Sequence, residues 1–590
     1  MSTQNSPDFE NYLKTLYCEE PNTVPLGDFH VDQILMDQFM DKPVTTVQDQ
    51  IDFRVAAGYD FVVGLSGIYE LFGSKGGIGT KSELAKTSSG GERTRSWANE
   101  HEGVITDWDQ FERFAWPSID DFDMSIWATF DEILPEGMKA VLALGKIYTP
   151  AWMLMGAESF FSALEFNQTF VAAMFEKIGQ IQYEVFLRVI EHPCIGAVFS
   201  PDDIAHNTGL LINPAYLRKH LFPWYKKMGD VCRDKGIGYI FHSDGDCTDI
   251  MDDLIEAGFD AFNPIQPNCM DIVEVKKKWG EKLCLIGNIN LDSTLTLGSP
   301  EDVRAEVYER IRTIGPGGGY MVASSNSLTD YVPLDNMKAM LNATVEFGSY
   351  PLQLEEGKIN GKIWTFKGKP TKEKKEILSD LEVDQYMLAM VKKDIEGLVR
   401  LTQNEIQNGL SAPEVINNKM IPAMKLVGER FQGGEIFIPE MLMAAQAMSA
   451  AIAHFEDSLA GDEAKKMGKV VIGTVKGDLH DIGKNLVVMM MKGQGYEVED
   501  LGISVTTEKF VAAVNEIKPD ILAMSALLTT TMVEMKNNID ALTEMGLREK
   551  VKIIVGGAPL TQGFADEIGV DGYAYDAPGA AQLCDKLLNN

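Results

Sequence analysis

The chain has little of what disulfide-bonded, exported or membrane-spanning proteins need. Seven of its 590 residues are cysteine, and they are scattered without a C-x-x-C pair. This argues against a disulfide framework and for a reducing compartment. No run approaches the ~20 consecutive apolar residues of a membrane-spanning helix, and residues 1–20 lack the apolar stretch of a signal peptide. We therefore expect a cytoplasmic protein.

Positive charge is also scarce. The chain has 53 Lys and Arg against 87 Asp and Glu, which gives a formal net charge of −34. A field of this sign repels nucleic acid and anionic lipid, so we expect neither nucleic acid nor a membrane as a partner. Hydrophobic residues make up 45% and charged residues 24%, which is typical of globular proteins. A chain of this length is expected to form about two to four domains.

The first part of the chain, residues 1–356, alternates amphipathic segments with short apolar runs. Examples of the runs are GIGYIF (236–241), FDAFNPI (259–265) and KLCLIGNI (282–289). This alternation indicates parallel strands joined by crossover helices, and the length suits a TIM (β/α)8 barrel. The Lys- and Gly-rich residues that follow, 357–379, have little periodicity and indicate a linker.

Two further regions follow this linker, and the predicted fold class of the whole chain is α/β: a barrel, then a helical-bundle cap and a doubly wound domain. Residues 380–465 carry apolar residues at helical spacing and predict a helical-bundle cap. Residues 466–590 repeat a strand–helix unit five times, with the strands KVVIGTV, YEVEDLG, DILAMS, VKIIVGG and DGYAY. This predicts a flavodoxin-like (Rossmann-like), doubly wound sheet, whose ligands bind at the carboxyl ends of the strands.

The most specific motif lies directly after the first of these five strands. The loop GDLHDIGKN contains Asp478-x-His480-x-x-Gly483, which alone is also explained by an aspartate that caps a helix. Two more loops on the same predicted edge strengthen the motif. The third strand ends in Ser525-Ala526-Leu527, and the fourth ends in Gly556-Gly557.

Together these loops resemble the cobalamin-binding module of methionine synthase and of the corrinoid proteins of methanogens and acetogens. The preceding IPAMKLVGERFQGGEIFIPEMLMAAQAM resembles the helical cap of that family. The resemblance implies that His480 coordinates the cobalt of cobalamin, while Asp478 accepts a hydrogen bond from the other ring nitrogen. It further implies contacts to the corrinoid from Asp481, Ile482, Gly483, Ser525, Leu527, Thr529, Gly556 and Gly557.

The barrel region resembles the uroporphyrinogen decarboxylase superfamily, and in particular its cobalamin-dependent methyltransferase branch. The matching segments include PDDIAHNTGLL (201–211), FHSDGD (241–246), NPIQPNCMDI (263–272) and GPGGGYMVASSNSLTDYVP (315–333). Because that superfamily contains decarboxylases and methyltransferases, the fold alone does not decide the reaction. Fusion to a corrinoid module favours a methyltransferase, since a tether raises the effective concentration of the methyl carrier. The layout is similar to that of chloromethane methyltransferases.

The barrel departs from the zinc enzymes of this branch, which use H-x-C and a distant cysteine. Here the first motif reads His242-Ser243-Asp244, and the distant region reads Ala323-Ser324-Ser325. Zinc binding is left open, with His242, Asp244 and Cys269 as candidate ligands. The alternative for Cys269 is a buried, small apolar residue.

The candidate catalytic residues of the barrel are His242, Asp244, Asp246, Asp203 and Tyr331. If no metal binds, His242, Asp244 or Asp246 could serve as the acid that activates the leaving group. Structural alternatives remain for each aspartate, because Asp203 could cap a helix and HSDGDC has the composition of a turn.

We expect a cobalamin-dependent methyltransferase that moves a methyl group from a small molecule to protein-bound Co(I) cobalamin. The donor would be a methyl ether, amine, thioether or halide. Alternatives are transfer from methylcobalamin to a thiol, a decarboxylase-like lyase, and a corrinoid carrier whose barrel is not catalytic. Expected partners are the methylated donor, a separate methyl-acceptor methyltransferase and a reductive activator of Co(II).

Overall fold

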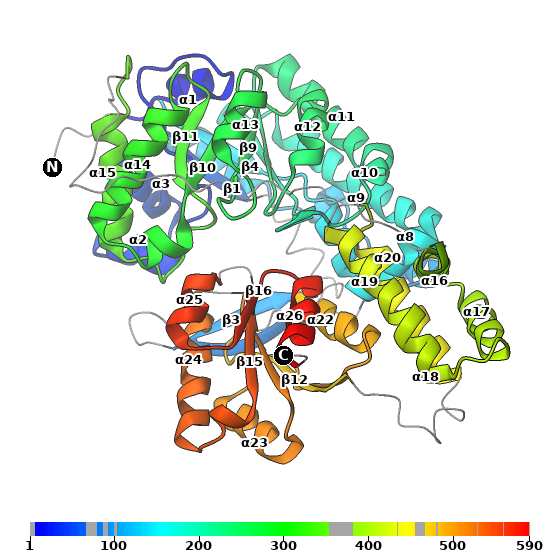
Figure 1. The fold of residues 1–590 in the computed structure, drawn as a ribbon. Helices are drawn as coiled ribbons and strands as arrows, with labels where there is room; N and C mark the ends of the chain where they lie inside the picture. The colour runs from blue at the N-terminus through cyan, green and yellow to red at the C-terminus, as the bar shows by residue number, and fades with distance from the viewer. Residues whose placement is uncertain are drawn as a thin grey trace. The chain divides into compact units, whose positions relative to one another are not determined.

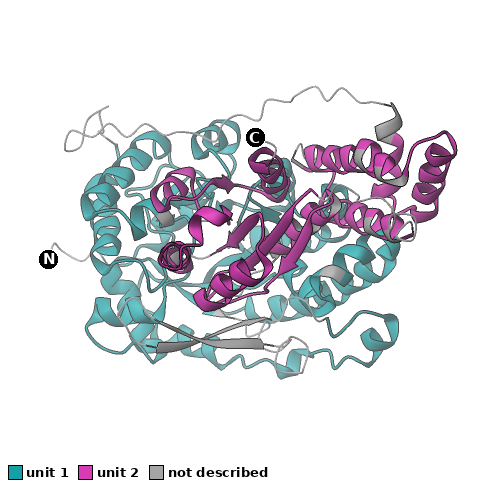
Figure 2. Cartoon of the chain, turned by 60° about the horizontal axis from the view of Figure 1, so that its bottom comes forward, with its two compact units in different colours: residues 1–81, 86–372 teal, residues 82–85, 373–590 magenta. Residues whose placement is uncertain are grey.

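The computed structural model divides the chain into two compact units, shown in Figure 2. One contains residues 1–81 and 86–372, and the other contains residues 82–85 and 373–590. The residues described are 6–65, 80–86, 92–98, 103–352, 381–432, 435–454, 467–478, 482–527, 529–557 and 560–588. Among them, no helix combines the length and the apolar composition that crossing a membrane requires.

The first unit is built on a parallel sheet of seven strands that neighbour one another in chain order. The strands are β1 (Phe61–Leu65), β4 (Lys139–Ala143), β5 (Ile195–Pro201), β8 (Gly238–His242), β9 (Ala261–Asn263), β10 (Cys284–Ile289) and β11 (Tyr320–Ser324). Their side chains are almost all buried on both faces of the sheet, as expected when helices cover a parallel sheet.

An irregular segment, residues 24–31, takes the eighth position between β11 and β1. Leu26 forms a parallel bridge with Val322, and the backbone N–H of Gly27 donates to the Val322 carbonyl at 2.8 Å. On the other side, the ring of Phe29 lies 5.3 Å from that of Phe61 in β1. The sheet thereby curls into the predicted TIM barrel.

Helices surround this sheet (Figure 1). Their ends follow ordinary capping chemistry: α14 begins with a Ser299–Asp302 capping box and Pro300 in its first turn, and α11 ends at Gly236, whose φ is 67°. The helices are α1 (Phe9–Leu16), α2 (Gln33–Met40), α3 (Val47–Ala57), α5 (Trp108–Arg113), α6 (Ser125–Ile133), α7 (Tyr148–Met155), α8 (Ala157–Phe166), α9 (Gln168–Val189), α10 (Pro214–His220), α11 (Phe222–Lys235), α12 (Met251–Ala257), α13 (Ile272–Trp279), α14 (Pro300–Ile314) and α15 (Leu334–Phe347).

Short elements lie in the connections between the strands of the barrel, and residues 82–85 of one of them are grouped with the second unit. Two-stranded sheets are formed by β2 (Thr80–Lys86) with β3 (Glu92–Ala98), and by β6 (Ala205–His206) with β7 (Gly209–Leu210). Single helical turns occupy Ile119–Asp121, Thr248–Ile250 and Leu291–Thr296.

The second unit begins with the helices predicted as a bundle. They are α16 (Leu381–Val391), α17 (Ile395–Gln407), α18 (Ala412–Val415) and, after a π turn at Ile416–Met420, α19 (Ile421–Gln432) and α20 (Ile438–His454). The helical conformation is interrupted between α16 and α17 at Lys393, whose φ is 51°, and the Asp394 side chain caps α17. No glycine or proline marks this break in the sequence.

A five-stranded parallel sheet follows, in the order β13-β12-β14-β15-β16. This order is that of a flavodoxin-like sheet, and all five predicted strands are present. They are β12 (Lys469–Thr474), β13 (Glu497–Asp500), β14 (Ile521–Ser525), β15 (Lys552–Gly556) and β16 (Gly572–Ala574). The connecting helices are α22 (Ile482–Gly493), α23 (Thr507–Ile517), α24 (Thr529–Glu544), α25 (Gln562–Ile568) and, at the end, α26 (Ala577–Leu588).

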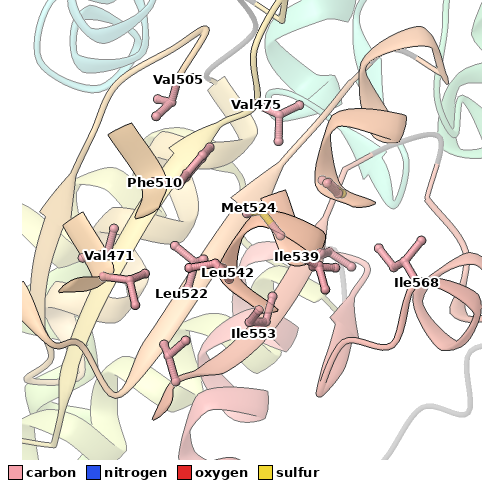
Figure 3. Packing of buried hydrophobic residues seen from close by; sticks show 14 of the residues in the cluster. Val471, Val475, Val505, Phe510, Leu522, Met524, Ile539, Leu542, Ile553 and Ile568 are labelled. Atoms are coloured by element: carbon pink, nitrogen blue, oxygen red, sulfur yellow. The ribbon is translucent and has the colours of Figure 1, made fainter. Parts of the chain in front are cut away.

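The core of this sheet is continuous across its strands (Figure 3). Val471, Leu522 and Ile553 are paired residues on adjacent strands and lie in one buried row. Phe510 of α23 and Ile539 of α24 join the same cluster. This packing fixes the strands against the helices, and so fixes the loops at the carboxyl ends of the strands.

Candidate functional site

In the second unit, one buried carboxylate ties together the carboxyl end of β12 and the start of α24. Asp478 lies shortly after β12 and is fully buried. Its Oδ2 accepts hydrogen bonds from the Leu527 backbone N–H at 2.6 Å and from the Thr531 hydroxyl at 2.7 Å. Hydrogen bonds to an ionised acceptor are short and strong, so Asp478 holds this edge in a defined shape.

Thr531 was not predicted as part of the site. It follows Thr529 and Thr530 in the first turns of α24, and the run of three threonines after a strand was the available signal. Only the fold shows that the Thr531 hydroxyl reaches the carboxylate.

The predicted glycines of this edge differ in how much space surrounds them. A Cβ on Gly483 would meet no atom within 4 Å, whereas a Cβ on Gly556 would lie 3.0 Å from the Ala574 carbonyl oxygen. Gly557 has a φ of 138°, and a Cβ there would lie 1.7 Å from the Ala526 carbonyl oxygen. Gly483 therefore borders open space, while Gly557 is required by the close approach of two backbone segments.

The remaining predicted residues of this edge are partly described. Ser525 ends β14 and pairs with Thr474 and Gly556 on the neighbouring strands, and the side chain of Leu527 is exposed. His480, Asp481 and the side chains of Ile482 and Thr529 lie outside the described residues. The hydrogen bond from His480 to Asp478 thus stays a prediction.

In the first unit, three predicted residues meet at the carboxyl end of the barrel. Asp203 follows β5, His242 ends β8, and Asp244 follows it. One ligand atom of each lies within 4.8 Å of those of the other two. His242 Nε2 is 3.9 Å from Asp203 Oδ1, which also accepts a hydrogen bond from the Asp244 backbone N–H at 3.1 Å. We call these three residues the barrel triad.

Neighbouring amides hold two members of the barrel triad. Asn326, after β11, donates through Nδ2 to both carboxylate oxygens of Asp244, at 3.1 and 3.0 Å. Asn263, which ends β9, places its Oδ1 2.6 Å from His242 Nδ1. Burial, and next the charge of Asp203, raise the pKa of Asp244 to about 6. The two carboxylates therefore repel one another, which a bound cation or a shared proton relieves.

The structure changes the predicted ligand set. Cys269 is buried, and its Sγ faces Gln266 Oε1 at 3.5 Å and Asn207 Oδ1 at 3.7 Å. Cys269 does not join His242 and Asp244 in the close group, and Asp203 takes the third place. This fits the alternative of Cys269 as a buried, small side chain.

The region of the distant cysteine also has a structural role here. The backbone N–H and the hydroxyl of Ser324 both donate to buried Asp28 Oδ1 at 2.8 Å. The other oxygen of Asp28 accepts from the Tyr59 hydroxyl at 3.0 Å. Ser324 therefore anchors β11 to the irregular eighth segment.

The other two candidates of the barrel, Asp246 and Tyr331, both lie in turns. Asp246 Oδ1 accepts from the backbone N–H and the hydroxyl of Thr248, at 3.2 and 2.6 Å, in a tight turn. Tyr331 is half-buried in the turn after β11.

No helix begins at Asp203, because β6 follows it, so the helix-cap alternative for Asp203 is wrong. Its neighbour Asp202 has that role instead. The buried Asp202 carboxylate accepts from the backbone N–H groups of Ile147, Tyr148 and Thr149 at the start of α7.

Family models match three parts of the chain. "Uroporphyrinogen decarboxylase (URO-D)" matches residues 126–347, and two models named "B12 binding domain" match residues 382–456 and 468–581. A corrinoid protein of Desulfitobacterium hafniense is 39% identical over 209 residues, which are 35% of this chain and 97% of that protein.

The chain belongs to the corrinoid protein family. Cobalamin is the cofactor of this corrinoid protein, and the edge around Asp478 lies within one of its B12-binding regions. A dimethylamine corrinoid protein of Methanosarcina mazei is 45% identical over 176 residues, 30% of this chain and 82% of its own length. A methyltransferase from Methanosarcina mazei is a structural neighbour with 17% identity and a TM-score of 0.43, covering 57% of this chain and 98% of that one.

The residues around Asp478 fit cobalamin. Leu527, whose backbone N–H donates to Asp478, has an exposed side chain, and a Cβ on Gly483 would meet no atom within 4 Å, so a large ligand can approach the backbone at these two residues. A URO-D region and a B12-binding region in one corrinoid protein support corrinoid-dependent methyl transfer.

Proposed function

We propose that this corrinoid protein takes a methyl group from a methylated small molecule at the mouth of its barrel and transfers it to its own cobalamin. Bound cobalamin, as Co(I), supplies the nucleophile for the methyl carbon. The donor is a methyl ether, amine, thioether or halide. The observation that carries this proposal is the barrel triad, because it places an imidazole and two carboxylates where the substrates of such barrels bind.

The barrel triad would activate the leaving atom of the donor. Its donor set, one imidazole nitrogen and two carboxylate oxygens, suits a divalent cation such as zinc. A bound cation would supply Lewis acidity toward that atom. The residues themselves orient the donor, and Asn326 keeps Asp244 in place while its carboxylate is close to that of Asp203.

In the second unit, at the edge around Asp478, His480 would bind cobalt and Asp478 would hold the His480 ring. The described geometry supports the role of Asp478, because Leu527 and Thr531 already fix its carboxylate. The hydroxyl of Thr531 extends a hydrogen-bonded path that could move a proton to or from His480.

Transfer from cobalamin to a thiol is less well supported. Thiol-activating zinc sites of this branch rely on cysteine ligands, and the barrel triad has none. A separate methyl-acceptor methyltransferase and a reductive activator of Co(II) remain expected partners.

Single-turnover methylation tests the proposal. The full chain is loaded with hydroxocobalamin, reduced to Co(I) and mixed with methanol, 2-methoxyphenol, dimethylamine, dimethyl sulfide or chloromethane. We expect at least one donor to abolish the Co(I) absorption, about 10³-fold more slowly in His242→Ala, an effect typical of losing one activating group. His242→Ala should retain its corrinoid, whereas His480→Ala should change the Co(II) spectrum. Loss of Co(I) at equal rates in wild type and His242→Ala would contradict a catalytic barrel, and failure of every donor would contradict the direction of transfer.

A further inference from the structure

The hydrogen bonds of Asn263 fix the orientation of its side-chain amide. Asn263 ends β9, is 5% exposed, and pairs in register with His242 on β8. Its Nδ2 donates to the Ile286 carbonyl of β10 at 3.2 Å. The reversed orientation would set two carbonyl oxygens against one another. Oδ1 is therefore the atom that faces His242 Nδ1 at 2.6 Å.

This orientation determines which ring nitrogen of His242 carries the proton. An amide oxygen only accepts hydrogen bonds, so Nδ1 must donate and must hold a hydrogen. A neutral imidazole has one N–H, which leaves the lone pair on Nε2. Nε2 is the atom that lies 3.9 Å from Asp203, on the side of the barrel triad. The ring of Phe199, 5.3 Å away, packs against the imidazole.

We propose that Asn263 is a positioning residue that holds His242 as the Nδ1–H tautomer and presents its Nε2 lone pair to the ligand of the barrel triad. The ligand class is a divalent cation. The proposal rests on the proposed function for the identity of that ligand, but the tautomer itself is independent of it.

A neutral partner for His242 also suits the charge of this site. The barrel triad already holds two carboxylates, and a third would increase their repulsion. An amide oxygen orients the imidazole without adding charge. Because a partner of this kind usually changes metal affinity about 10- to 100-fold, its removal should be measurable in the apo barrel.

The first measurement is the tautomer of His242 in the metal-free wild type. The full chain is labelled with ¹⁵N-histidine, and His242→Ala assigns the His242 signals. We expect a protonated Nδ1 and an unprotonated Nε2 at pH 8. The opposite tautomer would overturn the proposal without any variant of Asn263 having to fold.

The second measurement is zinc affinity by chelator competition. Asn263→Leu should weaken binding at the triad about 10- to 100-fold. The matched control is Asn336→Leu. Asn336 is another buried asparagine, 2% exposed, whose Nδ2 donates to the Leu295 and Gly298 carbonyls. Equal loss in the control, or none in Asn263→Leu, would overturn the proposal.

These results separate the inference from the proposed function. Suppose that zinc does not bind, that His242 prefers the Nδ1–H tautomer in wild type, and that this preference is lost in Asn263→Leu. The role of Asn263 then stands and the metal is wrong. If zinc binds but Nε2, rather than Nδ1, is protonated in the metal-free wild type, the metal stands and the role of Asn263 is wrong.

Discussion

The Asp478 edge of the second unit and the barrel triad of the first place carboxylates at the ends of parallel strands in opposite ways. At the first, a fully buried carboxylate accepts from a backbone N–H and a hydroxyl, and Gly483 of the same predicted edge borders open space. At the second, two carboxylates lie next to an imidazole, and the pKa of Asp244 rises to about 6 through burial and the charge of Asp203. An edge that holds a large cofactor needs shape and room, whereas the barrel triad keeps charge that is incompletely compensated, as the proposed activation of a small substrate would require.

The largest expected effect tests the shape of the Asp478 edge. Gly557→Ala would place a Cβ 1.7 Å from a backbone oxygen at a φ of 138°, so we expect the second unit to lose on the order of 3 kcal/mol of stability. Gly483→Ala is its matched partner, because a Cβ there meets nothing within 4 Å.

Gly483→Ala should leave the apo protein as stable as wild type, or up to about 1 kcal/mol more stable, since alanine has a higher helix propensity than glycine. Its affinity for hydroxocobalamin should nevertheless fall, because the new methyl group fills the open space. Denaturant unfolding of the apo chain and a titration followed by absorbance measure the two quantities. Undiminished cobalamin binding by Gly483→Ala would show that the space at Gly483 is not used by the cofactor.

The strands of both units follow from the sequence, and the reasons are local. Short apolar runs bounded by glycine or aspartate form the strands. The run VKIIVGG, for example, contains β15. The irregular segment at 24–31 escaped prediction because it has no alternation and is held by contacts to β11 and β1. The break at Lys393 is equally hidden, since it lacks a glycine or proline.

The sequence named most residues of the candidate sites, but it did not show which of them lie together. Sequence placed Asp203, His242 and Asp244 at strand ends, yet it could not tell that Asp203, rather than Cys269, would join the other two. Adjacent Asp202 and Asp203 point to different environments, one to a helix start and one to the triad. Such differences depend on side-chain direction at the end of a strand, which a one-residue shift reverses.

A second prediction tests the charge of the barrel triad through pH. The pKa of Asp244 is about 6 in the folded protein and about 3.9 in an unfolded chain. Between about pH 3.9 and about pH 6, therefore, the Asp244 carboxyl keeps its proton in the folded state and loses it in the unfolded state. Stability of the barrel therefore falls as pH rises from about 4 to about 6, and stays lower above that range.

Asp244→Asn removes this penalty and should stabilise the barrel by about 2 kcal/mol at pH 8, but little at pH 4. Thermal unfolding in the presence of a chelator measures the difference. Zinc should then stabilise the wild type more than Asp244→Asn, which has lost a ligand. An equal effect of the substitution at both pH values would mean that neighbouring groups already offset the charges of Asp203 and Asp244, as hydrogen-bond donors do for Asp478.

The smallest expected effect concerns the compensation of Asp478. Thr531→Val keeps the shape of the side chain but removes the hydrogen bond that the Thr531 hydroxyl donates to the carboxylate, so the second unit should lose about 1 kcal/mol. The control is Thr543→Val on the same helix, whose hydroxyl donates to the Ile539 carbonyl of its own helix and should cost less than about 0.5 kcal/mol. Denaturant midpoints of the apo forms give both values. The Thr531→Val protein should also bind hydroxocobalamin more weakly, because its Asp478 is less firmly held while Leu527 remains the other donor. Equal costs for the two substitutions would show that Thr531 contributes only as a helix residue, and that its hydroxyl is not needed to hold the carboxylate.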